Sequence, residues 1–540
     1  MGSITLRKAL GTLAKSSSFS VATETKHTDD PLNEYKQYLY VEPEIERDFV
    51  KCLDAMQQGE IVFLCGSSGD GKSEILTRHL DDYKDKCRFH LDATHSFSPS
   101  ETAIDALNSL FDEQQKDNRP LVVGINIGML ANFAKQGAER HGKLRESLER
   151  FLATGNRTDD CYHFLDFEAY PKFIFEEGVG KAPFIQKVLQ RISDLTDDNL
   201  FYKLLLKTEE LGDDVILATN FRLLSRPSVQ QAIITNLFKA RLGKNQFITT
   251  RSLLDFVYNL LVIGDEYLFD SLFTNTKSEL SRKLNDFDPA LIHTQKLDQF
   301  VLQYELGLIH HQLEPFISSL RKEIGIKFSF QPDVAGQAAS LIRLFYVLQN
   351  ESLSNNYHHT FKIDFSEQVL SHYAQIWMQH SNYSGATADK SSLRHYYTKE
   401  FIPAIVSYAN RKAPQLSKRE LFLGEFGTTL ISAPIEIKQD LTAVQKCSDK
   451  NVSHFMAFIK IGDITLRGIE VNLNLFELIK KLNHGYRPNK YDKNAVLLLD
   501  DICEQIINLA KGSDQLKFYY GSKVYQLRYD EDMITAEDVF

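Results

Sequence analysis

The chain has 540 residues, of which 43% are hydrophobic and 25% are charged, and its formal net charge is −10 at pH 7. These proportions are those of an ordinary globular protein, and the length predicts several domains at roughly 150 residues each. No apolar run approaches the ~18 residues of a transmembrane helix, and a negative chain is not attracted as a whole to nucleic acid. We therefore expect no membrane partner, and any contact with DNA must come from a local basic patch or from partner subunits.

The six cysteines are scattered along the chain, with no C-x-x-C pair and no histidine at metal-ligand spacing. This usage argues against a disulfide framework and against structural zinc. Because it is typical of proteins in a reducing compartment, we expect a cytoplasmic protein.

Residues 1–40 are predicted to form an N-terminal segment and a linker. The first 23 residues contain no acidic side chain, and Leu6, Leu10 and Leu13 recur at helical spacing. A transit peptide shares this basic, serine-containing composition, but the apolar core of a signal is absent. A short, frayed amphipathic helix is the preferred interpretation, followed by a polar linker over 24–34.

Residues 41–180 alternate helix and strand patterns and are predicted to form an α/β core. Apolar residues at helical spacing predict a helix over 43–56, ahead of the first strand. Strands are predicted at 61–65, 88–93, 121–126 and 162–167. Because helical patterns lie between these strands, the core is predicted to be a doubly wound, mostly parallel sheet.

The first strand leads into GSSGDGKS at 66–73, and a helical pattern follows from Glu74. Strand, G-x-x-x-x-G-K-S and helix together are the context of a phosphate-binding P-loop. Glycines let successive backbone N–H groups surround an anion, and the helix N-terminus favours the same charge. Lys72 is predicted to reach the β- and γ-phosphates and to act in catalysis, and Ser73 to ligate Mg²⁺. The predicted nucleotide-binding residues are Gly66, Ser67, Ser68, Gly69, Asp70, Gly71, Lys72, Ser73 and Glu74.

Two further regions are predicted beyond the core. Residues 181–410 carry an almost continuous helical pattern with few glycines or prolines. In P-loop ATPases such a region usually packs over the nucleotide as a lid. Residues 411–540 alternate apolar and polar side chains over short runs and predict a separate C-terminal α+β domain. The predicted fold is therefore a P-loop NTPase α/β core, a helical lid region and an α+β domain.

Four segments of the chain resemble the DptF family, the ATPase-like component of bacterial DNA phosphorothioation-dependent restriction systems. They are LRKAL at 6–10, FLCGSSGDGKSEILTR at 63–78, LDATHS at 91–96 and VGINIGML at 123–130. Apart from the glycine-rich motif, most ATPases do not share these segments. The resemblance implies a role in host defence, in which a complex with partner subunits cuts DNA that lacks the sulfur-for-oxygen backbone mark. No nuclease motif is found in the chain itself.

ATP hydrolysis needs an acidic residue to hold Mg²⁺ and commonly a glutamate to align the attacking water. No segment ends a buried strand with the expected Asp-Glu pair. Asp92, at the end of the second predicted strand, is the preferred catalytic acid and the second predicted metal ligand beside Ser73. Asn126, at the end of the third, is predicted to orient the water or the γ-phosphate, with a polar cap at a strand end as the alternative.

Four other acidic pairs follow apolar runs. They are Asp112-Glu113, Asp166 with Glu168, Asp265-Glu266 and Asp500-Asp501. The pair on the last predicted strand, at 166 and 168, could face the site. The pairs at 112 and 500 continue a helical period, and the pair at 265 is interpreted as a helix end.

Arg222, Arg226 and Arg251 lie in the predicted lid region. Each is a candidate for an arginine that stabilises transition-state charge at a neighbouring subunit. A structural or surface arginine is the alternative for each, because location alone supports the assignment.

Residues 480–493 form the one segment whose composition suggests contact with nucleic acid. Its basic side chains run from Lys480 to Lys493, with two tyrosines between them. Lysine and arginine bind phosphates, and tyrosine stacks on bases or sugars. A charged loop between two helices is the alternative.

Two functions from different classes are compatible with these features. The first is an ATP-binding, ATP-hydrolysing subunit that powers or gates a DNA-restriction complex, with ATP and Mg²⁺ as ligands and other subunits as partners. The second is a STAND-like switch or scaffold with little turnover, because the acidic pair is not evident. A small-molecule kinase is disfavoured by the long helical region and the additional C-terminal domain. ATP is preferred to GTP because no guanine-specific motif is present.

Overall fold

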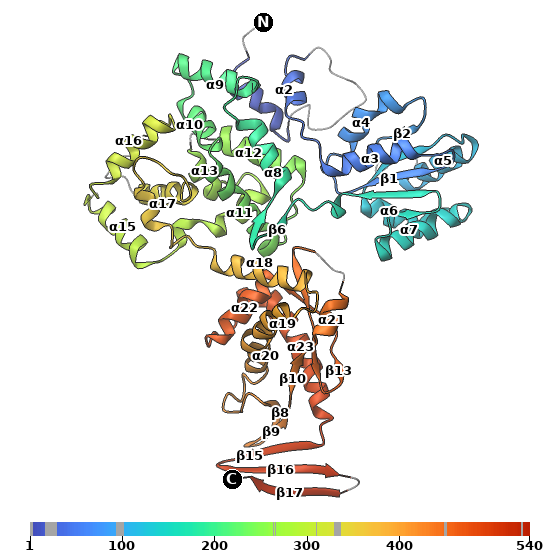
Figure 1. Ribbon diagram of the computed structural model, residues 1–540, viewed down its shortest axis with the longest axis vertical. Helices are drawn as coiled ribbons and strands as arrows, with labels where there is room; N and C mark the ends of the chain where they lie inside the picture. The colour runs from blue at the N-terminus through green and yellow to red at the C-terminus, as the bar shows by residue number, and fades with distance from the viewer. Residues whose placement is uncertain are drawn as a thin grey trace. The chain divides into compact units, whose positions relative to one another are not determined.

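The computed structural model describes residues 4–16, 30–92, 102–262, 264, 266–308, 310–328, 336–447, 451–530 and 533–539. The chain divides into two compact units, and each draws on more than one stretch of sequence (Figure 1). Unit 1 comprises Met1–Phe173, Ala182–Leu237 and Phe247–Ser366, and unit 2 comprises Ile174–Lys181, Phe238–Gln246 and Glu367–Phe540. No helix among the described residues combines the length and apolarity needed to cross a membrane.

Unit 1 contains a five-stranded sheet in the order β2-β3-β1-β5-β4. Its strands are β1 (Ile61–Cys65), β2 (Arg88–His90), β3 (Leu121–Ile125), β4 (Thr158–Asp159) and β5 (Tyr162–Asp166). β1 is buried throughout and pairs in parallel with β3 and with β5, while β2 continues the parallel sheet beyond β3 and β4 is antiparallel to β5. Because parallel strands end at one edge of a sheet, the residues that follow β1, β2, β3 and β5 meet there.

Helices cover both faces of this sheet. The face that carries Phe63 and Phe164 packs against three helices, and the face that carries Val62 and Leu64 packs against two. The first set is α5 (Ala103–Lys116), α6 (Ile127–Gln136) and α7 (Gly142–Thr154), and the second is α3 (Glu44–Ala55) and α4 (Lys72–Tyr83). Successive side chains of β1 enter opposite cores, as the two-residue period of a strand requires.

The rest of unit 1 is helical. Its helices are α8 (Pro183–Ser193), α9 (Leu200–Leu211), α10 (Val215–Leu224), α11 (Pro227–Lys244), α12 (Thr250–Val262), α13 (Leu268–Thr274), α14 (Glu279–Leu284), α15 (Gln295–Glu305), α16 (Leu313–Glu323) and α17 (Gln337–Val347), the end of α11 from Phe238 belonging to unit 2. Arg343 of α17 lies 2.8 Å from Asp270 of α13 and 2.7 Å from Asp288. These largely buried ion pairs tie distant helices of the region together.

The N-terminal segment packs within unit 1. The apolar residues of α1 (Leu6–Leu10) are buried, and Leu13 behind it is 3% exposed. Arg7 donates to the Asp214 carboxylate at 2.7 Å. The helix is thus held by packing and an ion pair, where the sequence predicts a frayed end. A second short helix, α2 (Asn33–Tyr38), lies in the region predicted as a linker.

Unit 2 is built from antiparallel sheets and helices. Its largest sheet has the order β17-β16-β15-β9-β8. The strands are β6 (Ile174–Glu176), β7 (Val179–Lys181), β8 (Glu420–Phe426), β9 (Thr429–Pro434), β10 (Ile437–Gln439), β11 (His454–Ala457), β12 (Ile459–Ile461), β13 (Ile464–Thr465), β14 (Ile469–Asn472), β15 (Gln515–Tyr520), β16 (Lys523–Asp530) and β17 (Met533–Val539). The helices are α18 (Gln368–Ser381), α19 (Thr387–Tyr396), α20 (Ile402–Ala409), α21 (Leu441–Lys446), α22 (Leu473–Asn483) and α23 (Lys493–Lys511).

The structure confirms the predicted sequence of regions: a mostly parallel sheet with helices, a helical middle, and antiparallel sheets at the C-terminal side. The predicted strand at 88–93 is shorter, since β2 ends at His90. Several strands were not predicted, among them β4 and the β6–β7 hairpin. The hairpin strands have three residues each, too few to show a period, and are joined by Glu177 and Gly178 at positive φ. The predicted domain boundaries stay predictions.

Candidate functional site

The glycine-rich loop, residues 66–71, connects the end of β1 to the start of α4. Gly69 and Gly71 have φ of +88° and +105°, a conformation that side chains disfavour, so these glycines permit the turn. Gly71 is the N-cap of α4, and the first N–H groups of a helix have no acceptor within it. The Gly66 N–H donates to the Ile125 carbonyl at 3.3 Å and ties the loop to the end of β3. This main-chain arrangement can accept an anion.

Lys72, the first residue of α4, folds back over the loop. Its Nζ donates to the carbonyl of Gly66 at 3.0 Å and to that of Ser67 at 2.8 Å. Burial lowers the pKa of Lys72, while the charges of Asp70 and Asp92 oppose that shift. An anion entering the loop can replace these carbonyls as the acceptor of stronger, charge-assisted hydrogen bonds.

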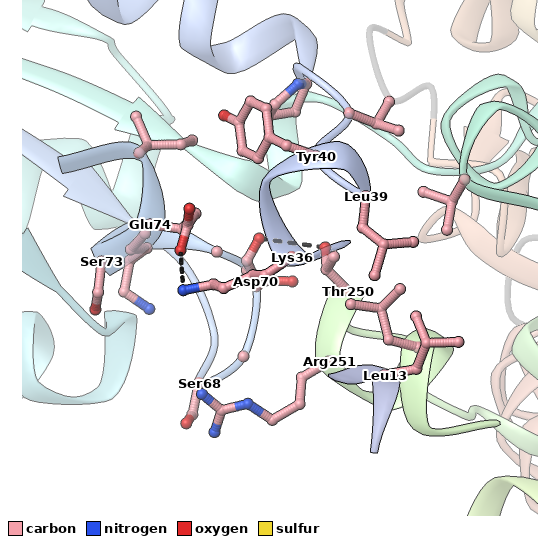
Figure 2. Close-up of a pocket in the computed structure, with 18 of the residues that line it drawn as sticks. Leu13, Lys36, Leu39, Tyr40, Ser68, Asp70, Ser73, Glu74, Thr250 and Arg251 are labelled. Carbon is pink, nitrogen blue, oxygen red and sulfur yellow. Dashed lines mark hydrogen bonds and ion pairs between the residues drawn. The ribbon is translucent and has the colours of Figure 1, made fainter. Parts of the chain in front are cut away.

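The loop opens into a cavity of about 380 Å³, which lies wholly in unit 1 (Figure 2). The loop and the start of α4 form its polar end. Apolar side chains form the rest, among them Leu13, Leu39, Val41, Phe184, Val188 and Leu254. This volume and this mixture of a few polar groups with apolar walls are those of small-molecule sites, which range over roughly 300–1,000 Å³.

Asp92 and Asn126 both line this cavity, although they follow different strands. Asp92 is exposed and lies two residues beyond β2, which is separated from β1 by β3. Asn126 is the N-cap of α6, and its Oδ1 accepts a hydrogen bond from the Met129 N–H at 2.6 Å. The Asn126 oxygen therefore caps α6, which was the alternative interpretation of this residue. Its amide NH₂ is the group that can contact a ligand.

The other acids on the sheet and helices lie elsewhere. Asp166 ends β5 beside Cys65, and its Oδ1 accepts from the Glu168 N–H at 3.0 Å. Burial raises the pKa of Asp166, and the charges of Glu168 and Asp70 add to the rise. Asp166 is not among the described residues that line the cavity.

The acids with helical periodicity are on helices, as that period predicts. Asp112 of α5 lies 2.7 Å from Arg140, and Asp500 of α23 lies 3.3 Å from Arg411. Neither is among the cavity residues. Asp265 falls outside the described residues.

The three candidate arginines have different surroundings. Arg222 makes two hydrogen bonds to Glu209, each 2.8 Å long, and Arg226 pairs with Glu351. Arg251 alone of the three lines the cavity, where it lies beside the loop of its own chain (Figure 2). A role at a neighbouring subunit stays a prediction.

Glu74 is the centre of a polar cluster at the edge of the cavity. It lies 3.2 Å from Lys36 of α2 (Figure 2). It also lies 3.2 Å from Arg78. The Arg78 guanidinium lies 3.4 Å from the centre of the Tyr40 ring. Burial raises the pKa of Tyr40, which donates a hydrogen bond to Glu46.

Sequence reasoning missed Lys36, Tyr40, Lys172 and Thr250 as residues of this region. The cavity is lined by segments that are far apart in the chain, from Thr12 to Leu254, so no spacing in the sequence marks these residues. For Lys172 alone the sequence held a signal, which is Asp70. An acidic side chain inside an anion-binding loop requires a nearby cation.

Residues 480–493 lie in unit 2 and join the end of α22 to the start of α23. Lys481 pairs with Glu477 at 2.7 Å, and the Tyr486 hydroxyl donates to Asp492 at 2.8 Å. Tyr491 is 84% exposed. The segment is a charged connection between two helices, which was the alternative interpretation, and part of it is open to solvent.

Within the described part of the chain, no cluster of three or more His, Cys, Asp or Glu side chains is arranged to hold a metal ion. Ser73 and Asp92 are the predicted metal ligands, and both line the cavity. Mg²⁺ in nucleotide sites commonly takes its remaining ligands from phosphates and water. A magnesium ion at this site would therefore depend on a bound nucleotide.

No protein-family model matches the chain, and no curated protein and no solved structure is significantly similar to it.

Proposed function

We propose that this chain binds a magnesium–nucleoside triphosphate at the glycine-rich loop and hydrolyses it as an ATPase-like subunit of the DptF type. One observation carries the proposal. A glycine-rich turn between a buried central strand and a helix N-terminus opens into a cavity of about 380 Å³ lined by Lys72 and Ser73. In this proposal the sheet and its helices are a doubly wound P-loop NTPase core, and the helices that follow act as its lid.

The proposed roles follow from the position of each group. Main-chain N–H groups of the loop and of the first turn of α4 bind the β-phosphate, and Lys72 bridges to the γ-phosphate. The Ser73 hydroxyl ligates Mg²⁺, and Asp92 holds the ion through its carboxylate or through water. The Asn126 amide orients the attacking water or the γ-phosphate.

The proposed place in DNA restriction rests on the resemblance to the DptF family, whose matching segments lie largely around the cavity. Three of the four segments that carry the resemblance contribute cavity residues: 63–78 through the loop and α4, 91–96 through Leu91 and Asp92, and 123–130 through Asn126. In this proposal partner subunits supply the nuclease and most of the contact with DNA. Residues 480–493 are the candidate for any direct contact by this chain.

ATP turnover by the assembled complex tests this proposal. Phosphate release is measured for the chain alone, with its partner subunits, and with unmodified DNA added, for wild type and for Lys72→Ala. We expect turnover that rises with partners or DNA and is lost in the variant. Turnover of equal size in wild type and Lys72→Ala would assign the activity to another site.

A STAND-like switch with little turnover is the second candidate, and one observation favours it. Among the described residues that line the cavity, Glu74 is the one glutamate, and it is engaged by Lys36 and Arg78. No glutamate there is placed to align an attacking water. Stoichiometric bound nucleotide with negligible phosphate release under every partner condition would select the switch over the ATPase.

A further inference from the structure

Asp70 introduces a negative charge into the loop that is proposed to bind a triphosphate. Its side chain is 2% exposed, so water screens it little. Its Oδ2 accepts a hydrogen bond from the Ser67 N–H at 2.8 Å, which fixes the carboxylate to the loop itself. Unless it were neutralised, this charge would oppose a phosphate bound to the same loop.

Lys172 supplies the opposite charge from another part of the chain. Lys172 belongs to the connection between β5 and β6, and its Nζ lies 2.6 Å from Asp70 Oδ1. The same Nζ donates to the Ile248 carbonyl at 3.1 Å, just before α12. The Lys172 side chain is 20% exposed, so the ion pair is mostly shielded from solvent. Buried charges of this kind are tolerated when paired and hydrogen-bonded, and are costly when one partner is removed.

The start of α12 also contacts the loop directly. The Arg251 N–H donates to the Gly69 carbonyl at 3.1 Å. The Thr250 hydroxyl donates to the Asp70 carbonyl at 3.3 Å (Figure 2). A Cβ on Gly69 would lie 3.2 Å from the Arg251 Cβ and 3.2 Å from the Thr249 hydroxyl oxygen. The loop is therefore packed closely against the start of α12. Lys172 contacts both, through Asp70 of the loop and through Ile248 just before α12.

We propose that Lys172 is a positioning residue of the nucleotide site, which neutralises Asp70 and anchors the glycine-rich loop to the start of α12 so that the loop accepts a triphosphate. This inference rests on the proposed function. It adds a requirement that the motif alone does not contain: a cation from outside the motif that is paired directly with the internal carboxylate of the loop.

A double-mutant cycle on the full chain tests this inference, with MgATP binding measured by calorimetry. Lys172→Met leaves Asp70 as an uncompensated charge, and we expect at least ~10-fold weaker binding. Asp70→Asn keeps an oxygen for the Ser67 N–H and removes the charge that Lys172 pairs with, so Lys172→Met is expected to cost much less affinity in the Asp70→Asn background than in wild type. Asp70→Asn/Lys172→Met is expected to recover the affinity lost in Lys172→Met.

The recovery separates charge compensation from a general loss of structure. Lys172→Arg, which keeps the charge, is expected to bind MgATP more tightly than Lys172→Met. If Lys172→Met does not fold, a folded double variant that binds MgATP supports the inference, because the charge left unpaired was then the cause. A double variant that does not fold, or that binds as weakly as Lys172→Met, would overturn the inference, as would wild-type affinity in Lys172→Met. Absence of MgATP binding to folded wild type would instead refute the proposed function itself.

Discussion

Asp92 and Asn126 follow different strands, yet both reach the cavity that holds the glycine-rich loop. Asp92 has a carboxylate that suits Mg²⁺, and Asn126 offers an amide NH₂ once its oxygen is committed to the α6 cap. Asp166 is closer to β1 in the sheet order but is not among the described cavity residues. Geometry therefore favours Asp92 over Asp166 as the acid of the site.

The Asp92→Asn variant tests whether this carboxylate is the acid of the site. Loss of one metal-holding carboxylate is expected to lower Mg²⁺-dependent phosphate release about 10–100-fold while nucleotide binding is largely kept. Asp166→Asn is the matched control, expected to leave turnover near wild type. Lost turnover in Asp166→Asn together with normal turnover in Asp92→Asn would assign the acid to β5.

Asn126→Ser separates the two roles of Asn126. Serine is also a favourable N-cap, so the free energy of unfolding is expected to change by less than about 0.5 kcal/mol. The amide donor is removed, so turnover is expected to fall at least ~10-fold, as when another transition-state donor is deleted. Asn126→Ala, which removes both roles, should lose about 1 kcal/mol as well. Normal turnover in Asn126→Ser would leave Asn126 as a helix cap and nothing more.

Among the elements, the buried strand β3 contains a glycine, Gly124, where neighbouring segments pack too closely for a side chain. A Cβ on Gly124 would lie 2.6 Å from the Leu91 carbonyl oxygen and 2.7 Å from a methyl group of Leu76. Leu91 follows β2 directly, so the glycine lets the end of β2 and α4 approach β3 closely. Asp92 and Asn126 follow the ends of these two closely packed strands.

Gly124→Ala is expected to destabilise the protein by about 1–3 kcal/mol through overpacking. Urea unfolding monitored by circular dichroism measures it. Gly142→Ala is the control, because nothing lies within 4 Å of a Cβ at that position in α7, and its stability should stay equal or rise by about 0.4–1 kcal/mol. Equal midpoints for the two variants would show that β3 can take a side chain at 124.

The sequence predicts well those elements whose burial requires a continuous run of apolar residues. β1 and β3 are continuous apolar runs between turn signals, and both are buried throughout. The glycine-rich turn is recognisable because its chemistry depends on local glycines at fixed spacing. Lys36, Lys172 and Thr250 carry no such pattern, because only the folding of distant segments brings them to the loop. Side chains of that kind have to be found in the structure.

Across the whole molecule, each compact unit is assembled from separate stretches of the chain. In unit 2 the rings of Phe175 and Phe238 lie 4.9 Å apart, and Phe175 lies 5.2 Å from the Trp377 ring. A Cβ on Gly180 would lie 2.0 Å from the Phe238 ring, so β7 and α11 pack with no room between them. Stretches before residue 247 thus complete a core that is formed mainly by residues 367–540.

Phe238→Ala tests that account in the full chain. Removing this fully buried ring is expected to cost unit 2 about 3–5 kcal/mol. Nucleotide affinity in unit 1 should be unchanged, so calorimetry and unfolding are read together. Phe426→Ala, at a phenylalanine that is 83% exposed in the same unit, is the control and should change little. A parallel loss of nucleotide affinity in Phe238→Ala would show that the two units are energetically coupled.

The central claim is that main-chain N–H groups, Lys72 and Ser73 together hold a triphosphate and its magnesium ion. Titration of the intact, folded chain with MgATP in a calorimeter tests it most directly. We predict one site per chain, and we predict that Lys72→Ala removes the binding heat without changing the circular dichroism spectrum. Absence of affinity for both MgATP and MgGTP in wild type, or undiminished binding in Lys72→Ala, would contradict the claim.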